Sequence, residues 1–467
     1  MHDVEKPPAR PTPLFTPPYP KPHHNKASLP RRFISAWGSW IHTLFEKSYS
    51  MKMGEVHLPK LDFYIANDPV IVDRVLDDKE KQFPKHQFLH DILSPAIGNS
   101  VFVANGTEWE NQRQMVNPAF QHTNLKRVFP MMRAAVDDLL AHIETLDQSK
   151  PIEVDPLMTF VAADIIYRTM FSVKLDHDQA EVIYEAFNRF QKYSQPGSIL
   201  RIYGFPMFGY QKSALKAATE VHAVFAPIVR ERFDAWHAGR GEVKKDILQP
   251  LLEAKHPETG EPFSFRDIME QISLIFLAGH ETAASALTWG LYLLSECPHL
   301  QESLAAEIDQ DTDGRPLGFD HLKKLNGVRN LFKETMRLYP PISFLMRAVT
   351  KPTTFRDKLL QKGAMIVISP WLVQRHTDNW KCPHAFMPDR FDDPEEAEAA
   401  KRAYMPFGRG PRICIGAGFA QQEGLLVLAS IIRRFRLRYP GGPKPEPVAK
   451  LTLRPKNVVK LFFERRA

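Results

Sequence analysis

The sequence predicts a mainly α-helical protein with small β-sheets, folded as a single large domain. Three observations lead to this fold class: helical periodicity covers most of the chain, strand-like segments are few and clustered, and no interior stretch is rich enough in Gly, Ser or Pro to act as a linker. With 467 residues, 43% of them hydrophobic, the chain has ample apolar content for one large core.

The N-terminal residues 1–45 are predicted to stand apart from a main domain at 46–467. Nine of the first thirty residues are proline, which favours an extended, weakly ordered arm. The stretch FISAWGSWIHTLF (33–45) is too short and too polar to cross a bilayer. It predicts a first amphipathic helix, for which packing on the domain is favoured over contact with a membrane surface.

The first half of the main domain is predicted to hold a strand, a helix, a loop and then a series of helices. DFYIAND (62–68) has the pattern of a strand, and PVIVDRVLDD (69–78) that of a helix opened by proline. Residues 84–106 show no sustained period and predict a loop. Helical spacing recurs over 107–117, 124–147, 156–173, 178–194 and 214–238. Pro, Gly and aromatic residues interrupt this series at 194–210, a candidate lid.

The longest predicted helix follows Ser264, which caps it together with Asp267, and ends before Pro298. Its length of about 32 residues makes a rod of about 48 Å, the diameter of a whole domain. The middle, ISLIFLAG, is apolar on all sides, so we expect this helix to be buried in the centre of the molecule. Later segments predict strands at 337–350 and 363–373, a helix at 417–434 and a last strand at 458–464.

Charge and cysteine content narrow the function classes. The net charge of +7 is modest for this length and favours a mildly basic enzyme over a nucleic-acid-binding protein. Cys297, Cys382 and Cys414 are odd in number and widely separated, which argues against a disulfide scaffold. Because the sequence has no C-x-x-C pair, a structural zinc site is not expected. A reducing cytoplasm fits this pattern best.

The most informative short stretch is FGRGPRICIG (407–416), which places Cys414 between glycines and arginines. This setting favours a thiolate. A thiolate is the axial ligand that donates most electron density to a porphyrin iron. Gly410 and Gly416 permit a turn that directs backbone N–H groups at the sulfur.

As a whole, the pattern F-x-x-G-x-R-x-C-x-G resembles the heme-binding loop of the cytochrome P-450 family, the heme-thiolate monooxygenases. The resemblance extends from about residue 60 to the C-terminus, with the motifs in the family's order. It implies the P-450 fold, in which heme b (iron protoporphyrin IX) lies between the long central helix and the loop that carries its ligand, Cys414. Phe407 would limit solvent at the sulfur, and Arg412 would meet a heme propionate.

LAGHET, on the long helix, resembles the family's oxygen-activating stretch. Ala278 and Thr282 lie one turn apart, and a threonine hydroxyl can bond back to the carbonyl four residues earlier and bend the helix. By this resemblance Gly279 opens a groove for O2, Thr282 donates a hydrogen bond to the oxygen, and Glu281 relays protons. No role is assigned to His280.

ETMR places Glu334 and Arg337 on one helical face. Followed by LYPP and then by FMPDRF with Arg390, it resembles the family's buried Glu–Arg–Arg network, which supports the heme loop. These three residues are therefore expected to be structural.

WENQR resembles the family's propionate-binding pair, Trp109 and Arg113, and Arg347 matches a further propionate contact. The resemblance also gives a set of apolar positions that face substrate, among which no charged anchor is evident. They are Phe88, Leu93, Phe102, Phe276, Ile342, Phe344 and Leu345.

The activity that the resemblance implies is insertion of one oxygen atom of O2 into a C–H bond of an apolar fatty-acid, terpenoid or polycyclic compound. Electrons from NAD(P)H would arrive through a separate ferredoxin or flavodoxin with its reductase, because the chain has no length for a fused reductase. Between Lys401 and Arg438, eight basic residues stand against one acid, Glu423, which suits an acidic partner. The expected protein is a cytoplasmic monomer that binds no nucleic acid.

Two alternatives stay open. One is a peroxygenase driven by peroxide, although such enzymes usually lack the acid–alcohol pair of Glu281 and Thr282. The other is a heme-carrying or gas-sensing protein without enzymatic activity.

Overall fold

In the computed structural model, residues 15–58, 61–206 and 209–466 are described. The helices are α1 Leu29–Gly38, α2 Pro69–Asp77, α3 Gln87–Ile97, α4 Gly106–Val116, α5 His122–Thr145, α6 Val154–Phe171, α7 His177–Ile202, α8 Tyr210–His237, α9 Leu248–Glu253, α10 Phe265–Ser295, α11 Pro298–Thr312, α12 Asn326–Leu338, α13 Pro370–Val373, α14 Pro394–Ala403 and α15 Ala417–Arg434. Short 3-10 helices are η1 Trp40–Thr43, η2 Glu46–Tyr49, η3 Asn117–Phe120 and η4 Pro388–Phe391. The expectation of a mainly helical, single large domain is confirmed.

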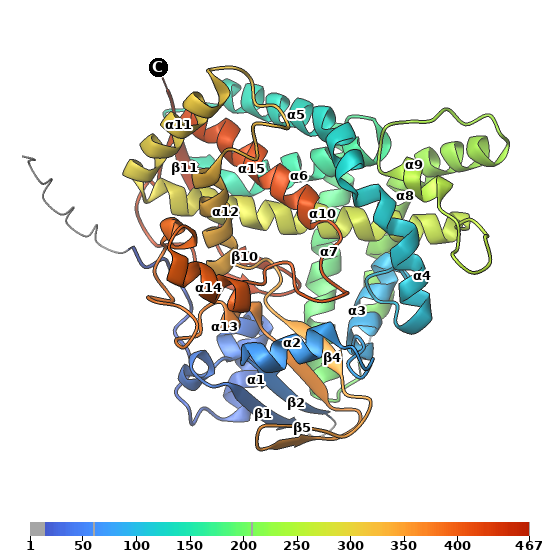
Figure 1. Ribbon diagram of the computed structural model, residues 1–467, viewed down its shortest axis with the longest axis vertical. Helices are drawn as coiled ribbons and strands as arrows, with labels where there is room; N and C mark the ends of the chain where they lie inside the picture. The colour runs from blue at the N-terminus through green and yellow to red at the C-terminus, as the bar shows by residue number, and fades with distance from the viewer. Residues whose placement is uncertain (1–14, 59–60, 207–208, 467) are drawn as a thin grey trace, which may run out of the picture.

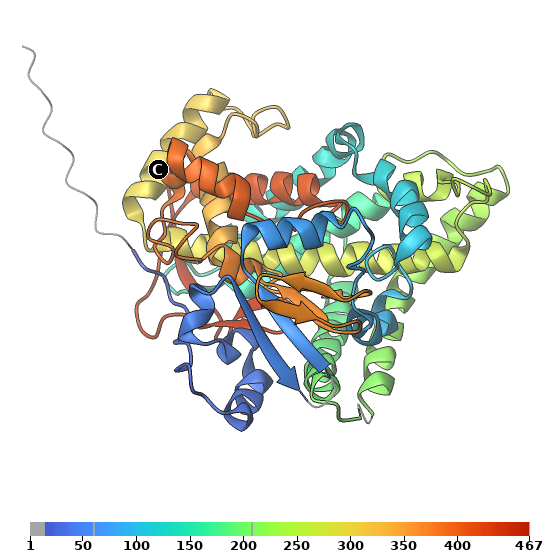
Figure 2. The same ribbon diagram turned by 60° about the horizontal axis from the view of Figure 1, so that its bottom comes forward.

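The strands are short and form four small sheets. They are β1 Met53–Leu58, β2 Leu61–Ala66, β3 Ile152–Glu153, β4 Leu345–Ala348, β5 Thr353–Phe355, β6 Lys358–Leu360, β7 Met365–Ile368, β8 Phe435–Arg438, β9 Pro447–Ala449, β10 Leu453–Pro455 and β11 Lys460–Arg465. The largest sheet has the order β1-β2-β7-β4, with β2 and β7 parallel and the other pairs antiparallel. Figure 2 brings this sheet forward, beside α1 and below the helical part.

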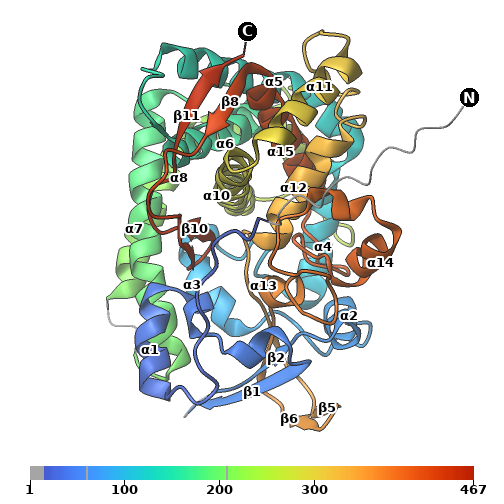
Figure 3. The same cartoon turned by 90° about the vertical axis from the view of Figure 1, so that its left-hand side faces the viewer.

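Helix α10 is the centre of the molecule, as its apolar middle predicts. Figure 3 shows it nearly end-on, surrounded by α5, α6, α12 and α15 (Figures 1 and 3). The Ser264 hydroxyl accepts a hydrogen bond from the Asp267 backbone N–H, and the Asp267 carboxylate accepts one from the Ser264 backbone N–H, so the predicted capping box is formed. Toward its C-terminal end, Ala284, Leu287 and Trp289 are fully buried.

Two segments predicted to be irregular are helical instead. The predicted loop at 84–106 contains α3, which the side chain of His86 caps and which accommodates Pro95 in its last turn. The candidate lid at 194–210 is helical as far as Ile202, because α7 continues through Pro196. Packing compensates for the backbone hydrogen bond that each proline removes, since the apolar residues of α3 and α7 enter the core.

The segment before the first strand packs on the domain, as expected. Ile41 and Leu44 belong to the main hydrophobic core, and Tyr339 Oη donates a hydrogen bond to the Pro18 carbonyl. The predicted helix at 33–45 is found as α1 followed by η1. The most proline-rich part of the predicted arm, 1–14, lies outside the described residues. Of the helices described, none combines the length and hydropathy that spanning a lipid bilayer requires.

Candidate functional site

The loop before α15 is shaped by backbone contacts that exclude side chains. Gly410 has φ +68°, and a Cβ at this position would lie 2.2 Å from the carbonyl oxygen of Leu76 at the end of α2. Only glycine fits so close to a neighbouring backbone. The loop then turns back on itself, since the Cys414 N–H donates to the Phe407 carbonyl over 2.9 Å. Phe407 itself packs against the core.

Cys414 is a solvent-accessible residue of this loop, although protein atoms crowd around its thiol. Burial raises the pKa of its thiol, while the Gly416 N–H, which is directed at the sulfur, and the charges of Arg113 and Lys85 oppose that rise. The thiolate that the sequence predicts at Cys414 stays a prediction. A bound metal ion would deprotonate the thiol outright.

Four cations surround the approach to Cys414: Lys85, Arg113, Arg347 and Arg412, called here the cation cluster. A backbone bridge joins Lys85 to Arg347, and burial followed by repulsion from the arginines lowers the pKa of Lys85 well below its usual range. Burial lowers the pKa of Arg347 to about 10, and burial with repulsion from Arg347 lowers that of Arg412 to about 10. Lys85 was missed from the sequence, where no motif marks it.

The hydrogen bonds of the cluster go to neutral acceptors. Arg412 donates to the Ala104 carbonyl over 2.9 Å, Arg113 donates to the Ile413 carbonyl over 2.9 Å, and Lys85 donates to the Phe102 carbonyl. Within the described part of the chain, no carboxylate lies within ion-pair distance of any of the four. The charge of Asp78 acts on Arg347 and Arg412 without pairing with either, so the cluster keeps an excess of positive charge. Such an excess fits an anionic group, for example the two propionates of heme.

Trp109 also lies in this region, beneath the guanidinium of Arg412, whose carbon is 4.2 Å from the ring centroid. The structure thus brings together Trp109, Arg113, Arg347 and Arg412, which the sequence grouped as propionate contacts. The observed role of the indole is to support Arg412 through a cation–π contact.

Helix α10 presents an accessible patch in the middle of its buried length. Ala278 is exposed and Thr282 is half-buried, although the residues on either side of this stretch are buried. Thr282 Oγ1 donates to the Ala278 carbonyl over 2.6 Å, the back-bond that the four-residue spacing predicts. Helix α15, which begins three residues after Cys414, packs against α10. The accessible patch and the Cys414 loop therefore belong to packed, neighbouring elements.

Comparison with known proteins agrees with these features. A family model described as Cytochrome P450 matches residues 35–462. The chain belongs to the cytochrome P450 family. It is therefore an oxidoreductase that incorporates oxygen, of a family whose members bind heme through a cysteine thiolate, take electrons from redox partners and act on apolar substrates.

Similar proteins occur in plants, bacteria and animals. Cytochrome P450 CYP72A616 of Paris polyphylla is 30% identical over 85% of this chain and 78% of its own length. Cyclooctatin synthase of Streptomyces melanosporofaciens is 28% identical over 87% of each chain. Cytochrome P450 4V2 of Rattus norvegicus is 27% identical over 88% of this chain and 83% of its own.

In the LAGHET stretch (277–282) of this P450, the structure shows what surrounds Gly279 and His280. A Cβ on Gly279 would lie 3.2 Å from Ile166 Cγ1, so the absence of a side chain makes room for α6, and the groove that the sequence predicts at this glycine stays a prediction. His280 is buried, bonds the Phe276 carbonyl through Nδ1 and packs against Phe187, and burial lowers its pKa, so it is neutral.

Glu281 is held in a closed ion pair. Arg454 donates to both carboxylate oxygens, over 3.0 and 2.7 Å, and Thr452 and Gln191 donate to Oε1 over 2.7 and 2.9 Å. Burial alone would raise the pKa of Glu281, but the Arg454 guanidinium outweighs burial and lowers the pKa to about 2. The carboxylate is thus ionised and bound to Arg454. To relay protons, Glu281 would first have to break this ion pair.

Glu334, Arg337 and Arg390 form one buried network. Arg337 donates to both oxygens of Glu334 over 2.7 Å, and Arg390 donates to Glu334 over 3.1 Å and to Glu396 over 2.7 Å. Arg337 also donates to the carbonyls of Gln374, Pro383 and Ala385. Every charge in this group has an opposite partner.

The residues predicted to face substrate divide into three groups by their exposure. Phe88, Leu93 and Phe276 are buried in the core, and Phe276 packs between Phe225 and His280. Phe102 is exposed beneath the ammonium of Lys85. Ile342 and Phe344, just before β4, and Leu345, its first residue, are half-buried.

Proposed function

We propose that this P450 inserts one oxygen atom of O2 into a C–H bond of an apolar organic substrate, using heme b bound through Cys414. The observation that carries the proposal is the cation cluster beside an accessible cysteine, because these groups require an anionic cofactor with a site for a sulfur donor. Relatives named cyclooctatin synthase and cyclooctat-9-en-7-ol 5-monooxygenase support the reaction class.

Different residues of this chain are proposed to hold different parts of the cofactor. Cys414 supplies the sulfur ligand, with the Gly416 N–H directed at it. Arg113, Arg347, Arg412 and Lys85 bind the propionates, and Glu334, Arg337 and Arg390 fix the backbone on which the loop rests. When bound, heme supplies the one-electron and oxygen chemistry that no side chain can perform.

Thr282 is proposed to position a proton carrier at the reacting oxygen. Its own hydroxyl proton is committed to the Ala278 carbonyl, so Oγ1 acts as an acceptor toward the accessible patch. A water molecule bound there would donate to Thr282 and have its second proton free. Glu281 would join this relay only after release from Arg454.

The experiment that tests the proposal is the absorption spectrum of the reduced protein with carbon monoxide. The wild type should show the long-wavelength Soret band characteristic of sulfur ligation, and Cys414→Ala should lose it. Cys297→Ala is the matched control, since Cys297 is half-buried and its burial raises the pKa of its thiol to about 11. A band that survives in Cys414→Ala would overturn the assignment of the ligand.

Electrons are proposed to come from a separate ferredoxin or flavodoxin in the cytoplasm. The basic surface predicted for its docking is smaller than the sequence suggested, because several of its arginines are already paired with acids. These pairs are Arg409–Asp73, Arg433–Asp309, Arg434–Glu144, Arg436–Glu302 and Arg438–Glu464. Glu423, the one acid of the stretch, is buried.

A peroxide-driven reaction is the second candidate, favoured by the closed Glu281–Arg454 pair. An acid held ionised by an arginine is a poor proton relay, and a reaction that starts from peroxide needs fewer delivered protons. Turnover with hydrogen peroxide and no turnover with a ferredoxin and its reductase would decide for this candidate. The opposite result would decide for the monooxygenase.

A further inference from the structure

Residues 15–22, FTPPYPKP, are called here the strap, and they run beside α12 (Figure 3). Half of these eight residues are proline. Proline fixes its own φ and directs the residue before it into an extended backbone. Every residue from Thr16 to Lys21 is a proline or precedes one, so the sequence favours the polyproline II conformation, with about three residues per turn.

The burial of the strap follows this period. Pro17 and Pro20, three residues apart, are buried. Thr16, Tyr19 and Lys21, which flank them, are exposed. Residues three apart lie on one face of a polyproline II helix, and segments of the form P-x-x-P dock on aromatic surfaces in this conformation. The strap therefore has both the sequence and the burial pattern of a polyproline ligand.

The side chains under the strap are aromatic. They are called here the aromatic surface and are Tyr49 of η2, Tyr339 just after α12, His384 and Phe386. Tyr339 Oη donates to the Pro18 carbonyl over 2.6 Å. The Tyr19 ring stacks on His384, with 4.3 Å between the ring centroids. Phe15 meets the Phe386 ring edge-on at 6.5 Å, and its carbonyl accepts from the Phe386 N–H over 2.9 Å.

The segment that carries His384 and Phe386 is held on its other side by Glu334 and Arg337. The carbonyls of the residues before and after His384 accept from Arg337 over 2.7 and 2.9 Å. The Met387 N–H, next to Phe386, donates to Glu334 over 2.9 Å. Alternate residues of an extended chain point to opposite sides. The strap and the Glu334–Arg337 pair therefore contact the same segment from opposite sides.

The strap can separate from the domain without loss of other structure. A polyproline II segment has no internal hydrogen bonds. Within the described ranges, the strap forms two hydrogen bonds with the rest of the chain, at the carbonyls of Phe15 and Pro18. Segments with so few contacts belong to the part of a native structure that opens most easily.

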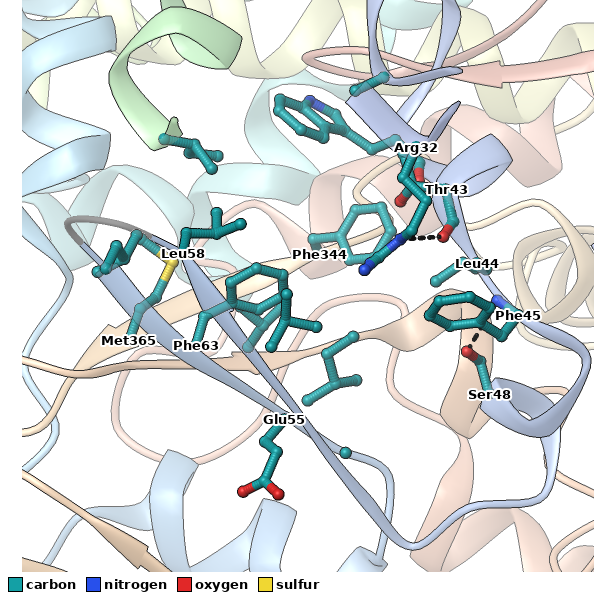
Figure 4. A pocket seen from close by; sticks show the side chains of 18 of the residues that line it. Arg32, Thr43, Leu44, Phe45, Ser48, Glu55, Leu58, Phe63, Phe344 and Met365 are labelled. Carbon is teal, nitrogen blue, oxygen red and sulfur yellow. Dashed lines mark hydrogen bonds between the residues drawn. The ribbon is translucent and has the colours of Figure 1, made fainter. Parts of the chain in front are cut away.

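The chain is fixed just after the strap. The His23 N–H donates to the Leu44 carbonyl over 2.8 Å, and the Glu46 N–H donates to the His23 carbonyl over 3.0 Å. Figure 4 shows Leu44 and Phe45 of this anchor among the residues that line an apolar cavity of about 440 Å³. A released strap therefore stays tethered, and a short tether keeps its effective concentration at about 1 mM.

We propose that the aromatic surface is a binding site for proline-rich peptides in the polyproline II conformation, with the strap as its ligand in the same chain. The stacking of Tyr19 on His384 distinguishes P-P-Y-P from other P-x-x-P segments. Binding of the strap orders the segment of His384 and Phe386 against Arg337, and its release loosens that segment. No step of the proposed oxygen chemistry takes part in this exchange, which is therefore independent of the proposed function.

Binding of a separate peptide tests the proposal in the full-length protein. The probe is a fluorescein-labelled peptide of residues 15–23, and fluorescence anisotropy measures its dissociation constant. In the wild type the tethered strap competes with the probe, whereas Pro17→Ala/Pro20→Ala lacks the two buried rings. We expect this variant to bind the probe at least about tenfold more tightly than the wild type, because the competing strap is present at about 1 mM.

Two results of this experiment would overturn the proposal. One is equal affinity of the wild type and the variant for the probe. The other is failure of the variant to bind the probe at concentrations up to about 1 mM, the effective concentration of the tethered strap. A probe in which alanine replaces the same two prolines should bind to neither protein.

Amide hydrogen exchange tests whether the strap orders the segment next to Arg337. The Phe386 N–H bonds the strap itself, but the Met387 N–H bonds Glu334, so faster exchange at Met387 reports more than the lost contact. In Pro17→Ala/Pro20→Ala both N–H groups should exchange at least about threefold faster, and the unlabelled peptide should reverse this change. Unchanged exchange at Met387 would overturn the proposed ordering.

The strap also offers matched variants. Thr16→Ala/Lys21→Ala, at exposed positions, should resemble the wild type in both measurements, and an effect equal to that of Pro17→Ala/Pro20→Ala would overturn the role of the buried prolines. Tyr19→Ala removes the stacking on His384 and should increase the affinity for the probe by about threefold. If the double proline variant does not fold, Tyr19→Ala decides, and an unchanged affinity there overturns the proposal.

Discussion

Two groups of buried charge in this P450 differ in one respect. In the Glu334 network (Glu334, Arg337, Arg390 and Glu396) every charge has an opposite partner within 3.1 Å. In the cation cluster of Lys85, Arg113, Arg347 and Arg412, four like charges meet, and among the described residues none of the four forms an ion pair with a carboxylate, although the charge of Asp78 acts on Arg347 and Arg412. We interpret the first arrangement as structural, and the proposed function assigns the second to the binding of an anion. Charge balance therefore separates structural residues from binding residues where burial alone does not.

The largest effect on stability is expected from a substitution in the Glu334 network. Glu334→Ala leaves Arg337 and Arg390 buried with one partner fewer, which should lower the free energy of unfolding by about 3–5 kcal/mol. Urea denaturation followed by circular dichroism measures this. A loss below about 1 kcal/mol would show that water or a rearranged carbonyl replaces the carboxylate.

The next largest effect is expected for Glu281, whose ion pair makes the stability of the protein depend on pH. Its folded-state pKa of about 2 lies below the ordinary value of 4.5, so its pairing stabilises the protein above pH 4.5, and this contribution is lost as the pH falls from 4.5 through 2. The shift corresponds to roughly 3 kcal/mol. Unfolding midpoints of the wild type and Glu281→Gln, measured from pH 6 to pH 3, should converge at the acidic end. Parallel curves would contradict the ion pair.

Loss of a charge from the cation cluster should stabilise the heme-free protein, whereas loss of a charge from the Glu334 network should destabilise it. Arg347→Met removes a buried charge that burial disfavours, so the heme-free protein should gain roughly 1–3 kcal/mol in the free energy of unfolding. The same variant should lose heme faster to an acceptor protein, by about tenfold. If the heme-free protein is destabilised instead, the charge of Arg347 serves the fold and the distinction between the two groups fails.

The smallest effect is expected for a surface pair. Arg438 and Glu464 meet over 3.1 Å, but both side chains are more than half exposed. Arg438→Gln should change the free energy of unfolding by less than about 1 kcal/mol. Because Arg438 is already neutralised, the rate of reduction by a ferredoxin should also stay within about twofold. Arg402→Gln, at an exposed position nearer the Cys414 loop, provides the comparison.

The sequence predicted what depends on local spacing and failed where distant segments meet. Ser264 and Asp267, or Thr282 and Ala278, are three or four residues apart, so helical geometry alone brings them together. Glu281 pairs with Arg454, and the backbone of Lys85 bridges that of Arg347, over separations that no local pattern encodes. Pro95 and Pro196 misled the prediction because tertiary packing outweighs the hydrogen bond that a proline removes from a helix.

The contact between Gly410 and Leu76 has a consequence for how this enzyme tolerates change. A clash with a side chain can relax by rotation, but a clash with a main-chain oxygen at 2.2 Å can relax only by moving one whole segment. Even one methyl group at position 410 would displace either the loop that carries Cys414 or helix α2. The position of Cys414, the proposed metal ligand, thus depends on α2, a helix that contains none of the proposed site residues.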